Sequence, residues 1–245
     1  MAKSDRHNTL ERLLQSQGFG PRKFCRRLIQ AGAVKVNGDF CDDPDMPFDT
    51  GDLRFEVEGF DGVWPFGRQA YILLNKPVGY ECSRAPKHHP SVLSLLPGPL
   101  RERDVQPVGR LDVDTTGLLL LTDDGQCIHV LTSPRHAVPK VYRATLAEAA
   151  DTSLCEQLLT GVLLKDEDEV LAAESCRLIE PTFLEMTITQ GKYHQVRRMV
   201  AAAGNHVSAL TRTSVGDLLL PSDLSPGGWR WLNAAEMQLA GWTPK

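Results

Sequence analysis

The amino-acid sequence predicts an α+β protein in two parts: a small N-terminal module of helices and strands, and a larger domain built on a mixed, mainly antiparallel β-sheet. At residues 9–58, apolar residues recur at helical spacing and short β-like runs follow them. From residue 70 onwards, β-like runs alternate with helix-like segments. The 245 residues suffice for one medium domain and a small one, so we expect domains at 1–58 and 70–245, joined by a linker at 59–69.

The N-terminal module begins with two short amphipathic helices. Their apolar positions are Leu10, Leu13 and Leu14 in the first helix, and Phe24, Leu28 and Ile29 in the second. Pro21 is well placed to start the second helix, because its fixed backbone angle suits the first helical turn. The sequence AVKVNGDF at residues 33–40 then predicts a strand, an Asn-Gly turn and a return strand.

The second helix carries four basic residues, Arg22, Lys23, Arg26 and Arg27. Residues four apart lie on the same side of a helix, so these side chains form one broad basic face. That face is either an RNA-binding surface or a solvated outer face, and composition alone does not choose between them. The hairpin directly after the basic helix favours the first, since this order resembles the S4 RNA-binding domain.

Charge is distributed unevenly along the chain. The net charge is -4, yet residues 1–37 hold eight Lys or Arg against two acids, and residues 38–58 hold eight acids against Arg54. The local distribution decides where phosphates are attracted, because surface charges are screened beyond about 8–10 Å. We therefore expect RNA contact on the helix side of the module.

Residues 59–69 are rich in glycine, which is typical of a linker. Their sequence is GFDGVWPFGRQ.

In the second domain we expect strands at residues 71–74, 118–122, 141–146, 183–189 and 207–210. We expect helices at residues 153–159 and 193–203.

No apolar signal segment or membrane-spanning run is present, so we expect a cytoplasmic protein.

The six cysteines are scattered and form no CxxC pair, which argues against a structural zinc site and for reduced thiols. We expect no metal.

The segment PVGRLDVDTTGLLLLTDDGQ at residues 107–126 is the most informative in the chain. A turn with a cation and a carboxylate precedes a run of four leucines that reads as a buried strand. This order displays Arg110 and Asp112 at the lip of the sheet, where they can meet a ligand. Composition alone equally supports a loop of turn and capping residues.

The segment GRLDVDTTGLLLLTDDG closely resembles the catalytic motif of the RsuA-type pseudouridine synthases. Four further stretches resemble the same family in the same order, and the small-subunit ribosomal RNA type most of all. They are LNKPVGYECS, LTSPRH with a following KVY, QGKYHQVRRM and AAAGNHVSALTRTSVG. The resemblance implies a pseudouridine synthase fold behind an S4-like module, and an enzyme that isomerises a uridine in 16S ribosomal RNA.

The resemblance also implies roles for three residues. Asp112 is the essential carboxylate, acting at the sugar either as nucleophile or as base. Arg197 is expected to be its buried cationic partner, because an opposite charge within ~4–6 Å favours the ionised carboxylate. Tyr142 matches the aromatic residue that packs on the target base.

Other basic residues are expected to contact RNA. Arg110 lies two residues before Asp112 and so points the same way in an extended stretch. Arg198 is expected at the RNA or the surface, and Lys76 is either a phosphate contact or a solvated turn lysine. The isomerisation needs no redox cofactor. We expect ribosomal RNA, free or in an assembling small subunit, as the partner of a monomeric protein with no membrane contact.

Three alternatives stay open. The target could be a uridine of large-subunit 23S ribosomal RNA, since the sequence gives only a hint of the target. The chain could instead be a non-catalytic S4-type binding or ribosome-assembly protein, although Asp112, Tyr142 and Arg197 together argue against that. An unrelated hydrolase using Asp112 is the weakest alternative, because no second acid or base is evident.

Overall fold

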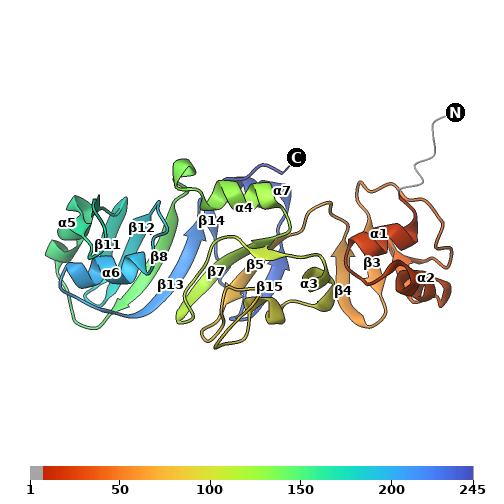
Figure 1. Cartoon of the computed structure of the whole chain (residues 1–245), viewed down its shortest axis with the longest axis horizontal. Coiled ribbons are helices and arrows are strands. Elements are labelled where there is room, and N and C mark those ends of the chain that lie inside the picture. Colours follow the sequence, from red (N-terminus) through yellow and green to blue (C-terminus); the bar gives the residue numbers. More distant parts are fainter. Residues whose placement is uncertain (1–7, 245) are drawn as a thin grey trace. The chain divides into compact units, whose positions relative to one another are not determined.

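The computed structural model describes residues 8–244 and divides them into two compact units (Figure 1). One unit contains the described residues up to Ala70 together with Leu96–Val105. The other contains Tyr71–Leu95 and the chain from Gln106 onwards. None of the helices in residues 8–244 is long and apolar enough to cross a membrane.

In the described residues, the first unit combines three helices with a four-stranded antiparallel sheet of order β2-β1-β3-β4. Figure 1 draws in red and orange the sheet and the first two helices of this unit. Its elements are α1 (Leu10–Ser16), α2 (Arg22–Gln30), β1 (Val34–Val36), β2 (Asp39–Phe40), β3 (Arg54–Val57), β4 (Phe60–Pro65) and the short α3 (Gly98–Glu102). Asn37 and Gly38 both have positive φ, as a tight two-residue hairpin turn requires. The expected helix, helix and hairpin are therefore confirmed.

The structure contains a strand where a linker was expected, and it adds the later segment Leu96–Val105 to the first unit. Strand β4 occupies most of the range 59–69 and pairs with β3, because its aromatic residues pack into the core of the first unit. Phe19 meets the rings of Phe60 and Trp64 edge-on, with centroids 5.2 and 5.3 Å apart. Arg103, which lies well inside the expected second domain, donates hydrogen bonds to the side chain of Gln17 and to the carbonyl of Gly67.

The second unit is built on a nine-stranded sheet whose main order is β11-β12-β8-β13-β7-β5-β15. Only β13 and β7 run parallel among its described strand pairs, which confirms a mixed, mainly antiparallel sheet. Its strands are β5 (Tyr71–Lys76), β6 (Gln106–Pro107), β7 (Thr115–Thr122), β8 (Lys140–Leu146), β11 (Ser175–Glu180), β12 (Phe183–Ile188), β13 (Val207–Val215), β14 (Leu218–Leu219) and β15 (Trp229–Trp231).

Helices and a small hairpin complete the second unit. The helices are η1 (Val92–Leu95), α4 (Gly125–Thr132), η2 (Pro134–His136), α5 (Thr152–Thr160), α6 (Gln195–Ala202) and α7 (Ala234–Leu239), and the hairpin pairs β9 (Val162–Leu163) with β10 (Val170–Leu171). Each of the five expected strands and both expected helices has a counterpart among these elements. The expected second helix begins two residues later than predicted, at Gln195, and this matters for the site below.

The four leucines of β7 are buried, and the strand lies between β5 and β13 at the centre of the sheet. Gly117 lies opposite Arg212 of β13, and a Cβ atom at this glycine would come within 2.2 Å of the Arg212 carbonyl oxygen. Glycine therefore lets the two strands approach at the point where the Asp112 turn enters the sheet.

Candidate active site

A buried lysine fixes the turn that carries Asp112. Lys76, at the end of β5, is fully buried, and its ammonium donates hydrogen bonds to the carbonyls of Asp112 (2.9 Å), Val113 (3.2 Å), Thr115 (2.8 Å) and Pro77 (3.1 Å). The β5–β7 register sets Lys76 opposite Gly117, which has no side chain to fill this space. Burial lowers the pKa of Lys76, and the nearby Asp112 and Asp114 oppose that shift.

This geometry corrects the two roles considered for Lys76. A fully buried ammonium that serves four backbone carbonyls is neither a phosphate contact nor a solvated turn lysine. Lys76 instead positions the Asp112 turn.

The side chain that pairs with the Asp112 carboxylate is a histidine. His194 Nε2 lies 3.3 Å from Asp112 Oδ1, and the Asp112 side chain is about one-third exposed, at 32%. His194 has a left-handed backbone (φ 47°) just before α6, and its ring stacks on Tyr193 at 3.9 Å. Sequence reasoning assigned His194 to the helix and so missed it. The unusual backbone angle turns it out of the helical direction.

Arg197 makes a different ion pair from the expected one. Its Nη2 lies 2.8 Å from Asp114 Oδ2, and its Nη1 donates to the Val207 carbonyl at 2.9 Å. Within residues 8–244, no ion pair links Arg197 to Asp112. Arg197 comes three residues after His194, about one helical turn further along the chain. It pairs with Asp114, which follows Asp112 by two residues in the same turn.

Arg198 is also engaged within the protein. It donates hydrogen bonds to the carbonyls of Lys165 and Tyr193 and lies 3.6 Å from Glu167. Lys192 forms a 2.5 Å hydrogen bond to the same Glu167 carboxylate. Arg198 therefore ties α6 to the loop at 165–167, and its expected contact with RNA has no support in this arrangement.

Asp112 and Tyr142 line one pocket of about 270 Å³, together with Arg110, Thr115 and His194. Tyr142 lies on β8 and is 8% exposed, while Arg110 is exposed. Asp112 and Tyr142 of the expected catalytic set are thus brought to one pocket together with Arg110, whereas Arg197 does not line it. The volume lies just below the range of about 300–1,000 Å³ that is usual for ligand pockets.

An unpartnered buried hydroxyl lies at this pocket. In the part of the chain that the structure describes, four buried side-chain polar atoms have no hydrogen-bond partner. Three of them belong to Thr115, Arg197 and Arg212, and the fourth lies in Thr9 of the other unit. Of these four residues, only Thr115 lines the Asp112 pocket, where a polar ligand would satisfy its hydroxyl.

The basic face of α2 is partly neutralised within the first unit. Arg22 and Arg26 both bind the buried Glu11 carboxylate, and Arg26 also pairs with Asp45 at 2.6 Å. Burial opposes ionisation of Glu11, but its hydrogen bonds to the two arginines outweigh burial and lower its pKa. Lys23 and Arg27 are exposed on the same helix and are the better placed of the four to meet RNA.

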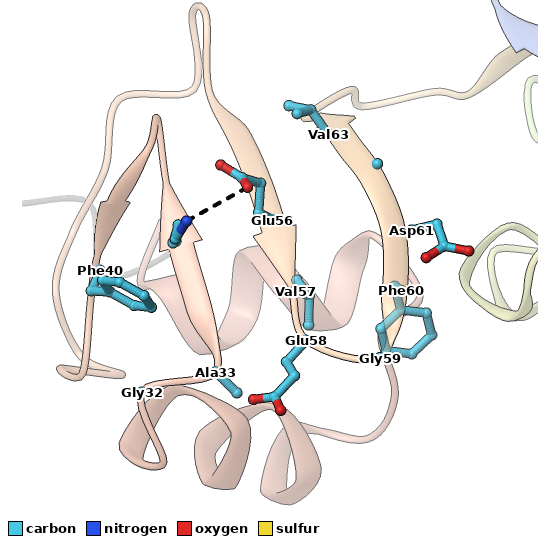
Figure 2. Close-up of a pocket in the computed structure, with 12 residues that line it drawn as sticks. Gly32, Ala33, Phe40, Glu56, Val57, Glu58, Gly59, Phe60, Asp61 and Val63 are labelled. Atoms are coloured by element: carbon cyan, nitrogen blue, oxygen red, sulfur yellow. Dashed lines mark ion pairs between the residues drawn. The ribbon is translucent and has the colours of Figure 1, made fainter.

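A hollow at the sheet of this unit is acidic. Glu56, Glu58 and Asp61 line it (Figure 2), and Lys35 is the one cation among its described lining residues. Lys35 lies 3.8 Å from Glu56 and 5.0 Å from the centre of the Phe40 ring. An acidic surface repels phosphates, which agrees with contact on the helix side.

Two known families match the chain. The family described as RNA pseudouridylate synthase matches residues 70–202, and the S4 domain matches residues 9–53. The chain is 45% identical over 231 residues to the ribosomal small subunit pseudouridine synthase A of Escherichia coli strain K12, covering 93% of this chain and 97% of that protein. It is 39% identical over 214 residues to the protein of the same name from Yersinia pestis, covering 87% and 85%.

A solved structure is similar over almost the whole chain. A crystal structure of a pseudouridylate synthase has 33% sequence identity and a TM-score of 0.67, and the match covers 95% of this chain and 99% of that one.

Proposed function

The chain belongs to the RNA pseudouridylate synthase family, and we propose that it isomerises one uridine of 16S ribosomal RNA with Asp112 as its catalytic carboxylate. One observation carries this assignment of Asp112. Its backbone is anchored by the Lys76 ammonium, while its carboxylate remains partly exposed in the pocket that Tyr142 lines. A carboxylate held in this way is preorganised for a reacting sugar.

The chemistry requires the N1–C1′ bond of uridine to break, the base to rotate and C5 to bond to C1′. Positive charge develops at the sugar carbon, and a nearby carboxylate can stabilise that charge or attack the carbon, as in glycoside chemistry. Asp112 serves this role in our proposal. His194, at 3.3 Å, then orients the carboxylate and donates to it.

The aromatic wall of the pocket supports base binding. An enzyme that acts on a base within a helix extrudes the nucleotide first. Stacking of the extruded base on Tyr142 would contribute ~1–3 kcal/mol. Arg110 lines the same pocket and is exposed, so it is suited to contact the backbone of the flipped nucleotide.

In this proposal Arg197 supports the site indirectly. Its pairing with Asp114 and with the Val207 carbonyl joins the Asp112 turn to α6 and β13. In the free protein, the arginine holds the adjacent acid.

The S4-like module supplies binding to ribosomal RNA, chiefly through Lys23 and Arg27, with Arg22 and Arg26 nearby. The small-subunit target is supported by the names of the similar Escherichia coli and Yersinia pestis proteins. We propose that the protein works as a monomer in the cytoplasm, where it meets free ribosomal RNA or an assembling subunit.

A primer-extension map after carbodiimide treatment tests the proposal, using both ribosomal RNAs with wild-type protein and Asp112→Asn. We expect one new stop in small-subunit RNA, absent with the variant, because Asn keeps the shape of Asp but removes its charge. A stop in large-subunit RNA alone would move the target and keep the chemistry. Product formed by the purified Asn variant would remove Asp112 from its catalytic role.

A further inference from the structure

A second cavity, of about 110 Å³, lies beside the candidate active site. It shares Gly109, Arg110, Tyr142 and Gly191 with the first pocket, so the two are neighbours around the Tyr142 ring. This volume exceeds several-fold the roughly 10–15 Å³ that one water needs. The cavity therefore has room for part of a small planar group.

Three cations line this cavity, and among its described lining residues there is no carboxylate. Arg110 is exposed, whereas Lys140 is partly buried and Arg212 is buried. Lys140 and Tyr142 are two residues apart on β8 and so lie on one face of the sheet. Arg212 of β13 is the register partner of Tyr142. Lys140, Tyr142 and Arg212 are thus adjacent on a single face.

The hydrogen bonds of these cations are incomplete. Arg212 is 3% exposed, and its Nε donates to the Leu118 carbonyl at 2.8 Å. Its Nη2 has no partner among residues 8–244. The Lys140 ammonium donates to the Val138 carbonyl at 2.7 Å, which uses one of its three protons.

Such an arrangement is unfavourable without a ligand. Burial, and then the charge of Arg212, lowers the pKa of Lys140 to about 8. Buried charges in proteins are normally paired. Two like charges in one small cavity therefore indicate a binding partner rich in electrons.

We propose that Lys140 and Arg212 form a subsite for the uracil base, donating hydrogen bonds to its carbonyl oxygens while the ring lies against Tyr142. The inference rests on the proposed function and deepens it. Breaking of the N1–C1′ bond leaves the electron pair on the base, as an anion delocalised over N1 and the two carbonyl oxygens. The same electrons form the C5–C1′ bond, after which C5 loses its proton and N1 gains one.

The walls of the cavity favour a base over a phosphate group. Val108, Leu120, Leu131 and Val215 give it apolar sides, and Tyr142 gives it an aromatic one. A phosphate group has no apolar or aromatic face to lie against such walls, and phosphate contacts serve to position the nucleic-acid backbone. A desolvated cation pair stabilises a developing anion far more strongly than it would in water.

The first test measures binding of two free rings of similar size by calorimetry: uracil, which is neutral at pH 7, and barbiturate, which is an anion there. We expect wild-type protein to bind barbiturate about tenfold more tightly than uracil, and Lys140→Met to remove most of this preference. Arg143→Met is the matched control, because Arg143 is on the same strand but exposed and paired with Glu185. Equal barbiturate binding by wild type and Lys140→Met would overturn the proposal.

The second test is kinetic and uses ribosomal RNA with the full chain. Lys140→Met should slow single-turnover product formation by about 100-fold, the low end for a group acting in the transition state, and leave the RNA Kd unchanged. Arg212→Gln should do the same if it folds. A parallel loss of RNA affinity with a flatter salt dependence would identify a phosphate subsite and refute the base-binding role. The two ideas can fail separately. If wild-type protein forms no product but still prefers barbiturate, the proposed function is wrong and the base subsite stands.

Discussion

Replacing Lys76 with methionine tests whether the buried ammonium positions the catalytic turn. Methionine has nearly the same length and fills the same space, but it donates no hydrogen bond. The four carbonyls that accept from Lys76 would lose that donor, although Asp112 and Val113 keep backbone donors in Thr115 and Gly79. The turn should therefore loosen without leaving a cavity.

The magnitude follows from two opposing terms. A hydrogen bond from a charged donor contributes about 1.5–3 kcal/mol net, so four of them favour the native state strongly. Burying the ammonium costs several kcal/mol, which the substitution recovers. We expect Lys76→Met to lower the free energy of unfolding by about 2–4 kcal/mol. A displaced turn should also slow the single-turnover rate by about 100-fold, since an error of 1 Å in positioning can have this effect.

Urea unfolding followed by tryptophan fluorescence measures the stability, because three of the four tryptophans, Trp229, Trp231 and Trp242, lie in the second unit. A loss of this size corresponds to a midpoint lower by about 1–2 M urea. Lys165→Met is the control, since Lys165 is an exposed lysine of the same unit. Wild-type stability together with a wild-type rate in Lys76→Met would refute the positioning role.

Three further changes give separate tests. His194→Phe keeps a ring to stack on Tyr193 but removes the donor to Asp112, so the single-turnover rate should fall by about 100-fold at unchanged RNA affinity; an unchanged rate would exclude His194 from the reaction. Replacing Lys23 and Arg27 with alanine should reduce the slope of log affinity against log salt by about 2, and a wild-type slope would remove α2 from the interface. The depressed pKa of Lys140 means that this group binds fewer protons in the folded state than in the unfolded state between about pH 8 and its ordinary value of 10.5. Its contribution to stability should therefore rise with pH across this window, and Lys140→Met should show a smaller rise than wild type, to which Lys76 still contributes.

The pattern of apolar residues predicted much of the fold because strands and helices with one buried face have a clear period. The four-leucine run, the Asn-Gly hairpin and the two N-terminal helices are all elements of this kind. The range 59–69 was predicted wrongly, since its three glycines suggested a linker while Phe60 and Trp64 pack in a strand. The glycine content indicated a flexible backbone, but the burial of aromatic side chains holds this range in a strand.

The sequence predicted which residues line the pocket better than it predicted which side chains contact one another. Asp112, Arg110 and Tyr142 do line one pocket. The burial of Lys76, the pairing of Arg197 with Asp114 and the approach of His194 to Asp112 depend on strand register and on one left-handed residue. Neither is readable from a local pattern, because register joins segments far apart and a positive φ at histidine has no sequence marker.

Residues 96–105 have a consequence for how this chain can be cut. This segment is reached only after the chain has entered the second unit, yet Arg103 binds Gln17 and Gly67 of the first. A fragment that starts at residue 70 would carry Arg103 without these acceptors, and a fragment that stops there would lack α3 altogether. A single cut at residue 70 therefore does not separate the S4-like module from the rest of the chain intact. Exchanging this module for another would require replacing residues 96–105 as well.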